Sequence, residues 1–365
     1  MALMHDRLLI SLLAALPDDV EGFRQRIGAL GTDGGELWQR LLDEAATHGV
    51  LGVIAVQLNG SELPAAVRES LDRRAAIEHL WSGQLRSALE QAAAALARAG
   101  VVSCALKGPV LAARLYADPA VRASMDIDLL VRPEDFDRAA AALHEAGYSG
   151  DSVVTAGYLR RHAHHLHFVK PGTPSLELHF HAYSGFGIVV PAGALMDRAV
   201  EYRLRDDLGL LVASPEDEFV YLAVHAAGHS FIRLVWLYDL KLFVRRYPSL
   251  DWAAVARAAE SLGVATAVAY TARLLNRWLA VDGMKLPAPF MRRALRAWVA
   301  DWLLAEASRP QPVSARDNLG GLLFTSLLCD TTGRSVSLVR HHGWRTIRRR
   351  LQRLAPDYLP EQWSA

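Results

Sequence analysis

Asp126 and Asp128 are separated by one residue inside an otherwise apolar segment, residues 125–131. On a β-strand alternate side chains face the same side, so both carboxylates would point together while Ile127 points into the core. Two carboxylates held this close repel each other unless a cation lies between them. Oxygen ligands of this kind favour Mg²⁺ or Mn²⁺ over softer metals. The pair therefore predicts a divalent-metal site, with two solvated side chains on an exposed strand edge as the alternative.

A second feature, Lys107-Gly108, lies between an apolar segment and Pro109, which suits the first turn of a helix. Glycine lets the backbone turn tightly or approach a ligand closely. The free N–H groups at the start of the helix and the Lys107 cation would both suit a phosphate group. A Lys-Gly pair before a helix is also a common plain turn, so this feature supports the aspartate pair rather than standing alone.

Histidines gather downstream at His162, His164, His165, His167, His179 and His181. A zinc site is conceivable because imidazole is a common zinc ligand. No cysteine accompanies the histidines, and alternation along strands is expected to divide them between two faces. The pattern favours a structural or substrate-contact role, and His179 is the one that shares a strand face with Glu177.

Two further groups of polar residues lie in the C-terminal half. His225, His229 and Arg233 follow helical spacing, with Asp239 later on the same expected helix. They predict a buried His-Arg-Asp network, with contact between Arg233 and a substrate phosphate as the functional alternative. The arginine-rich tail from residue 334 to residue 353 could bind nucleic acid. A solvated helix face or a domain contact is favoured, because the whole chain carries a net charge of only +1.

The elements that must position these residues alternate in kind. Residues 1–95 are expected to be helical, from apolar residues at three- and four-residue spacing. Strands are expected at 101–106, 125–131, 166–169 and 175–180, with helices at 110–116 and 136–146 and a hairpin turn at 171–174. Helices resume at 216–244, as one or two, and at 252–281. The order predicts a mixed α+β fold, with a core at 96–212 between helical regions at 1–95 and 213–365.

Composition narrows the class of protein. Of the 365 residues, 52% are hydrophobic and 22% are charged, which is typical of a globular protein. The near-neutral charge gives no support for a membrane or nucleic-acid partner. Two cysteines, Cys104 and Cys329, fit a reducing compartment. We find no apolar stretch long enough to span a bilayer, so the sequence predicts a soluble cytoplasmic protein.

Several motifs together resemble the uncharacterised bacterial nucleotidyltransferase family, of the polymerase-beta-type nucleotidyltransferase superfamily. They are Leu106-Lys107-Gly108, Leu115-Tyr116, the run from Arg122 to Val131, Gly147-Tyr148, Glu177-Leu178-His179, and His225 followed by Arg233 to Leu240. The resemblance covers most of the chain and is most specific over residues 101–240.

The resemblance implies a set of roles. Asp126 and Asp128 would hold two divalent ions, Mg²⁺ or Mn²⁺, and Glu177 would complete the triad. Gly108 and the backbone near it would hold the triphosphate. The candidate nucleotide-binding residues are Lys107, Gly108, Arg122, Ser124, His179 and Arg233. Typical members carry Gly-Ser at the turn, whereas this chain has Lys107-Gly108-Pro109, so Ser124 or Arg122 would have to replace the missing hydroxyl.

The implied reaction transfers a nucleoside monophosphate from a nucleoside triphosphate (NTP), such as ATP, to an acceptor and releases pyrophosphate. The expected acceptor is a hydroxyl or phosphate of a small molecule or a peptide. Two alternatives stay open. One is a toxin-like transferase acting on RNA, which the basic tail suggests. The other is a non-catalytic scaffold that binds a nucleotide or a partner protein, which the missing serine suggests.

Overall fold

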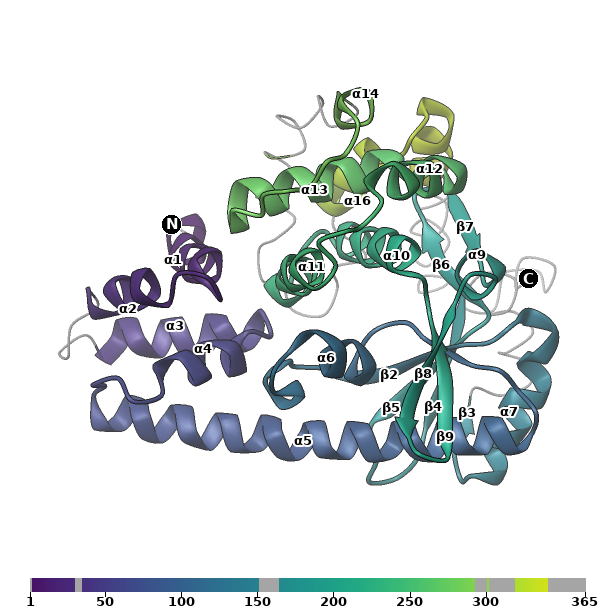
Figure 1. Cartoon of the computed structure of the whole chain (residues 1–365), viewed down its shortest axis with the longest axis horizontal. Coiled ribbons are helices and arrows are strands. Elements are labelled where there is room, and N and C mark those ends of the chain that lie inside the picture. The colour runs from purple at the N-terminus through teal and green to yellow at the C-terminus, as the bar shows by residue number, and fades with distance from the viewer. Residues whose placement is uncertain (1, 30–34, 151–163, 293–300, 302–318, 341–365) are drawn as a thin grey trace, which may run out of the picture.

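A seven-stranded mixed sheet with helices on both sides lies toward one end of the molecule, and the helices of residues 2–58 lie at the other end (Figure 1). The structure is a computed structural model that describes residues 2–29, 35–150, 164–292, 301 and 319–340. The strand order is β3-β4-β5-β2-β1-β9-β8. The strands are β1 (Cys104–Ala105), β2 (Asp126–Leu130), β3 (Ser149–Gly150), β4 (His165–Val169), β5 (Ser175–His179), β8 (Val200–Arg205) and β9 (Leu208–Val212). The prediction of a mixed α+β fold is confirmed.

The predicted strands are present, and most of them are shorter than expected. The segment at 101–106 contributes only two residues to the sheet, as β1. The hairpin predicted at 171–174 does join β4 to β5 as an antiparallel pair. The sequence analysis did not identify β8 and β9, nor the separate two-stranded sheet of β6 (His181–Gly185) and β7 (Ile188–Pro191). Strands β6 and β8 alternate polar and apolar residues, whereas β7 and β9 are short apolar runs that the sequence analysis passed over.

Strand β2 is central and is paired on both edges. It runs antiparallel to β1 and parallel to β5, and its register places Asp128 opposite Glu177. Ile127 and Leu129, at most 1% exposed, point into the core beneath the sheet. Asp126 and Asp128, which alternate with these two residues, point to the other face of the sheet, as strand alternation requires. The exposed-edge alternative is therefore wrong for this strand, because an edge strand has one unpaired side.

Helix α5 (Ala65–Arg98) runs along one whole side of the molecule (Figure 1). Its C-terminal half buries Leu85, Leu89 and Leu96 against the apolar face of the sheet. In the middle, the Trp81 indole Nε1 donates a 2.8 Å hydrogen bond to the Ser124 carbonyl. The helix therefore supports the segment that leads into β2. The helix also continues past residue 95, where the sequence analysis placed a domain boundary. The boundaries at residues 95 and 212 stay predictions.

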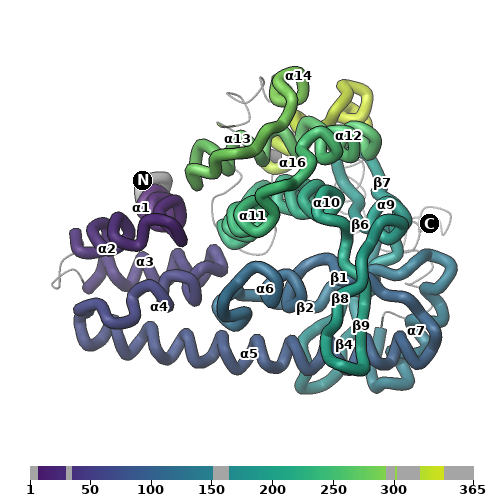
Figure 2. The backbone as a smooth tube through the Cα atoms, viewed as in Figure 1, coloured from purple at the N-terminus to yellow at the C-terminus, as the bar shows by residue number. Residues whose placement is uncertain are grey.

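Four helices precede α5 in the described part of the chain (Figure 2). They are α1 (Ala2–Ala15), α2 (Val20–Gly28), α3 (Gly35–Thr47) and α4 (Leu51–Leu58). The N-terminal half of α5 packs against the last two of them, α3 and α4. A short 3-10 turn, η1 (Pro119–Val121), rests on the start of α4. Between α5 and the C-terminal helices lies α6 (Pro109–Leu115), while α7 (Phe136–Glu145) follows β2.

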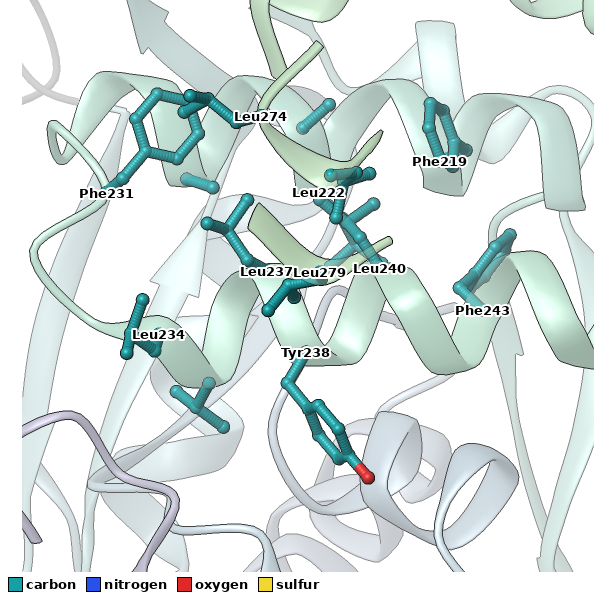
Figure 3. Packing of buried hydrophobic residues seen from close by; sticks show 14 of the residues in the cluster. Phe219, Leu222, Phe231, Leu234, Leu237, Tyr238, Leu240, Phe243, Leu274 and Leu279 are labelled. Atoms are coloured by element: carbon teal, nitrogen blue, oxygen red, sulfur yellow. The ribbon is translucent and has the colours of Figure 1, made fainter. Parts of the chain in front are cut away.

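The C-terminal helices form a layer over the polar face of the sheet. They are α10 (Pro215–Gly228), α11 (Leu234–Arg246), α12 (Trp252–Leu262), α13 (Ala265–Leu279), α14 (Ala288–Met291) and α16 (Leu319–Leu327), with α9 (Gly193–Met196) preceding them. Figure 3 shows Leu222 of α10 packed with Leu237 and Leu240 of α11 in this core, whereas Tyr238 points the other way. The Tyr238 ring lies 6.1 Å from that of Tyr116. Among the described residues, each helix is either too short or too polar to span a bilayer.

The segment predicted as one or two helices at 216–244 is two helices with a sharp break. Ser230 and Phe231 adopt left-handed φ angles of 53° and 52°, which ends the helical path after Gly228. Arg233 then caps the start of α11 in an extended conformation. The continuous helical stripe from His225 through His229 to Arg233 was therefore wrong. A positive φ reverses the chain direction within two residues, and these residue types do not signal it.

Replacing Gly52 with alanine tests the seating of η1 on α4. A Cβ there would lie 2.6 Å from the Val121 carbonyl oxygen and 2.7 Å from its Cα, so backbone would have to move. We expect a loss of about 1–3 kcal/mol in the free energy of unfolding, measured by chemical denaturation. Gly83→Ala, in α5 with nothing within 4 Å, is the matched control and should stabilise by about 0.5–1 kcal/mol. Equal stability of Gly52→Ala and the wild type would contradict this packing.

Candidate functional site

Three carboxylates converge on the polar face of the sheet. Asp126 and Asp128 come from β2 and Glu177 from β5, and the parallel register sets Asp128 directly beside Glu177. Asp128 is 1% exposed, and the side chain of Asp126 keeps 28% of its exposure. Strand pairing thus brings together acids that lie about fifty residues apart in the chain.

Lys107 compensates much of the negative charge. Its Nζ lies 2.8 Å from Asp128 Oδ2 and 3.5 Å from Asp126 Oδ1, so one ammonium bridges both aspartates. Burial disfavours that charge, but Asp128 and Asp126 outweigh burial and raise the pKa of Lys107. Lys107 is therefore an ion-pair partner of the acids in this structure rather than a side chain directed only at phosphate.

His179 provides the second partner. Its Nε2 lies 3.2 Å from Asp128 Oδ1 and 3.3 Å from Glu177 Oε2. Burial opposes the charged imidazole, yet the hydrogen bonds to the two carboxylates raise the pKa of His179. The imidazole links the carboxylates of the two strands.

The aspartates respond differently to the shared environment. Burial and the neighbouring Asp128 charge raise the pKa of Asp126, in spite of Lys107. Burial also acts to raise the pKa of Asp128, but Lys107 and the His179 hydrogen bond hold it well below the usual range. Asp128 is thus a firmly ionised group at the centre of the site.

His165 and His167 share this face, as alternation requires, but His164 lines the cavity as well, which corrects the expectation that the cluster is divided between two faces. Both His165 and His167 belong to β4, which begins at His165. Because they are two residues apart on a strand, their side chains point the same way. The β4–β5 register pairs His165 with His179 and His167 with Glu177. Burial, followed by the His179 charge, lowers the pKa of His165 to about 4. His162 lies outside the described residues.

The carboxylates open into a cavity of about 520 Å³. Its floor is the polar face of the sheet, and its opposite wall comes from α10, β6 and the segment before α11. Aromatic rings gather on that wall, where the Trp236 ring centroid lies 5.1 Å from that of His225 and 5.2 Å from that of His229. A cavity of this size, with an apolar wall and convergent polar groups, suits a small-molecule ligand.

The glycine turn lies at the edge of the cavity. Gly108 has φ +70°, a backbone conformation that is strained for residues with a side chain. A Cβ there would lie 3.4 Å from the Asp126 carbonyl oxygen. It caps α6, which has seven residues. Arg114 holds α6 in place through a 2.7 Å ion pair with Glu218 of α10. Gly108 therefore presents backbone, not side chain, to the ligand space.

Arg122 forms a buried network that the sequence analysis did not foresee. Its guanidinium donates to both Asp239 carboxylate oxygens at 2.7–3.2 Å and to the Ser124 hydroxyl. The Tyr116 hydroxyl donates to the same carboxylate at 2.7 Å. The predicted network of His225, Arg233 and Asp239 is thus wrong in its partners, since Asp239 pairs with Arg122.

Arg233 reaches the cavity from the other side. Among the described residues, it has no carboxylate oxygen within ion-pair distance, and its Nε is buried without a hydrogen bond. Burial and the Arg122 charge lower the pKa of Arg233. A Cβ on Gly49 would lie 2.7 Å from its Nη2, so glycine makes room for the guanidinium. The arrangement leaves this cation available to an anionic ligand.

Some cavity residues were missed by sequence reasoning. Tyr183, Tyr221 and Trp236 all line the wall. Tyr221 lies one helical turn before His225, and this spacing could have identified it. Of the predicted basic tail, Arg334 donates a 2.9 Å hydrogen bond to the Gly263 carbonyl, which lies in the same C-terminal helical region. The arginines from 345 onward lie outside the described residues.

Comparison with protein-family models gives a match over residues 35–280 to the family described as uncharacterised nucleotidyltransferase. The matched range runs from α3 to the end of α13 and contains every cavity residue named above. No curated protein matches the chain.

Glu78 of α5 lies beside the site, and its buried carboxyl group should make the stability of the protein depend on pH. Burial raises the pKa of its carboxyl from 4.5 to about 7, against the opposing effects of the Gly52 N–H and Arg233. The folded protein then holds this proton more tightly than the unfolded chain does. The stability that the group contributes is present below pH 4.5 and is lost as the pH rises through about 7.

Glu78→Gln should remove this loss, so denaturation curves should show its stability gain over the wild type growing across that pH range. Glu69→Gln, an exposed position on the same helix, is the control and should show no such trend. A gain for Glu78→Gln that is equal at acidic and neutral pH would contradict the assignment.

Proposed function

Because the chain belongs to the uncharacterised nucleotidyltransferase family, we propose that it transfers a nucleoside monophosphate from an NTP to a small-molecule or peptide acceptor in a metal-dependent reaction. The acceptor group would be a hydroxyl or a phosphate, and pyrophosphate would leave. We further propose that the sheet is of the polymerase-beta type. The observation that carries the proposal is the parallel register that sets Asp128 beside Glu177, with Asp126 on the same face.

The donor set fits divalent cations. Three carboxylates with both buried and exposed oxygens provide the hard ligands that Mg²⁺ and Mn²⁺ prefer. The Lys107 ammonium already bridges Asp126 and Asp128, so this place in the structure accepts positive charge. When bound, two such ions would neutralise the attacking and leaving oxygens of an in-line displacement at phosphorus. Asp126, Asp128 and Glu177 are the residues that we propose to hold them.

The chain's own residues would bind and orient the reactants. Glu177, with His179 beside it, is placed to accept the proton of the acceptor hydroxyl as its oxygen attacks phosphorus. Gly108 offers close backbone approach to the phosphates, and Lys107 can turn to them once other cations neutralise the aspartates. Position and charge supply the catalysis in such transfers, rather than a covalent nucleophile.

Arg233 is the strongest candidate for a phosphate ligand. It is largely buried, points to the cavity and lacks an ion-pair partner among the described residues, so an anion would relieve the cost of its burial. Arg122, by contrast, is held by Asp239, so we propose that it positions the Ser124 hydroxyl. Ser124 would then take the place of the serine that typical members carry at the glycine turn.

Asp126→Asn and Asp128→Asn test the metal site. Each keeps the side-chain shape and removes a charge that the bound cations need, so we expect turnover to fall on the order of 10²–10³-fold or more. Pyrophosphate release with Mg²⁺ and each NTP in turn, over a panel of acceptors, is the measurement. Asp197→Asn, on an exposed aspartate, is the control.

Circular dichroism should confirm that both variants fold. Undiminished turnover in either would remove the proposed metal ligands. Metal-dependent NTP binding by a wild type that releases no pyrophosphate would instead favour the scaffold alternative, and release that depends on added RNA would favour the RNA transferase.

Arg233→Met tests the phosphate contact. Loss of a charge-assisted hydrogen bond costs about 1.5–3 kcal/mol, so we expect NTP affinity to weaken about 10- to 100-fold. Calorimetric titration with a non-hydrolysable NTP analogue measures this. Arg132→Met, at a half-exposed surface ion pair, is the matched control. Equal NTP affinity in Arg233→Met and the wild type would exclude Arg233 from phosphate binding.

A further inference from the structure

A second group of metal-ligating side chains lies beside the three carboxylates. We propose that His165, His167 and Glu177 bind a transition-metal ion such as Zn²⁺, at a site separate from that of Asp126 and Asp128. The inference needs only the geometry of the β4–β5 hairpin and does not rest on the proposed reaction.

The ligand groups are gathered closely enough for one ion to reach all three. One ligand atom from each residue lies within 4.8 Å of the other two. His165 Nε2 lies 3.7 Å from Glu177 Oε1, whereas His167 approaches that oxygen through Nδ1 at 3.6 Å and His165 Nε2 through its own Nε2 at 3.3 Å. Tetrahedral zinc with bonds of about 2.0–2.1 Å sets neighbouring ligand atoms about 3.3 Å apart. To bind an ion here, the half-exposed His167 ring would turn so that one of its nitrogens faces both His165 and Glu177.

The backbone fixes the three side chains on one face. His165 and His167 are alternate residues of β4, and the antiparallel register sets His167 directly opposite Glu177. Strand pairing rather than a loop therefore holds the ligands. Sites built on paired strands keep their geometry better than sites on loops.

The Glu177 carboxylate serves both groups through different oxygens. Its Oε2 lies 3.3 Å from His179, on the side of Asp128, whereas Oε1 faces His165 and His167. The two clusters share one side chain but not one ligand atom. An ion bound at each would therefore be bridged by this carboxylate.

The chemistry of the ligands differs between the two clusters. Imidazole nitrogen selects Zn²⁺ and its transition-metal neighbours, whereas Mg²⁺ prefers oxygen. All three residues line the cavity, and the His167 side chain is 58% exposed. Three protein ligands with an open position are typical of catalytic zinc sites, while structural sites have four. The ion would thus meet whatever ligand enters the cavity.

Calorimetric titration of the full chain with ZnCl₂ in excess Mg²⁺ tests the site, with Co²⁺ absorption as a second readout of tetrahedral coordination. The wild type should bind one Zn²⁺, and His165→Ala or His167→Ala should weaken it at least about 100-fold. His79→Ala, an exposed histidine outside the cavity, should bind as the wild type does.

Asp128→Asn separates this proposal from the proposed reaction. It should retain Zn²⁺ binding although turnover is lost. Absence of Zn²⁺ binding in the wild type would overturn the site, as would unchanged binding in both histidine variants. Zn²⁺ binding that disappears in Asp128→Asn but survives in the histidine variants would place the ion on the aspartates and also overturn it.

Discussion

The parallel pairing of β2 with β5 is the constraint on which the rest of the site depends. It forces ionisable carboxylates of two distant segments into contact on a face that the C-terminal helices cover. Like charges at that distance are tolerated only with compensation. Lys107 supplies it from the turn after β1, and His179 supplies it from β5 itself. The C-terminal helices then enclose these partners in the cavity.

Two separate ion-pair groups on opposite sides of the cavity balance the buried negative charges. Lys107 serves the carboxylates on the sheet, while Arg122 is held by Asp239 on α11. The second pair ties the segment before β2 to the C-terminal helices, and Trp81 ties the same segment to α5. Arg233 alone among these three basic residues lacks a carboxylate partner in the described part of the chain. An anionic ligand would complete the balance, as expected of a nucleotidyltransferase that takes an NTP.

The features of the fold and the site that depend on local sequence pattern and spacing could be predicted. The apolar run around Asp126 and Asp128 indicated a buried strand, and Gly108 before Pro109 indicated the turn. The long-range pairings could not be predicted, because Arg122 and Asp239 are 117 residues apart. The break at Ser230 was not predicted either, because Ser230 and Phe231 are non-glycine residues, which rarely adopt positive φ angles. His164 lines the cavity beside His165 because it lies just before β4, outside the alternation of the strand, and such boundaries are the least certain part of a sequence-based assignment.

The length of helix α5 limits where residues can be inserted or deleted without disturbing the fold. Its 34 residues extend roughly 50 Å, and they present Glu78 to α4, Trp81 to the segment before β2, and Leu85 onward to the sheet. Each added or deleted residue turns everything beyond it by about 100°. Substitutions on the exposed side of α5 leave this phase intact, whereas an insertion between Glu78 and Leu85 would rotate one set of contacts out of register with the other. An insertion or deletion in this stretch of α5 would therefore disturb the fold more than a substitution on its exposed side.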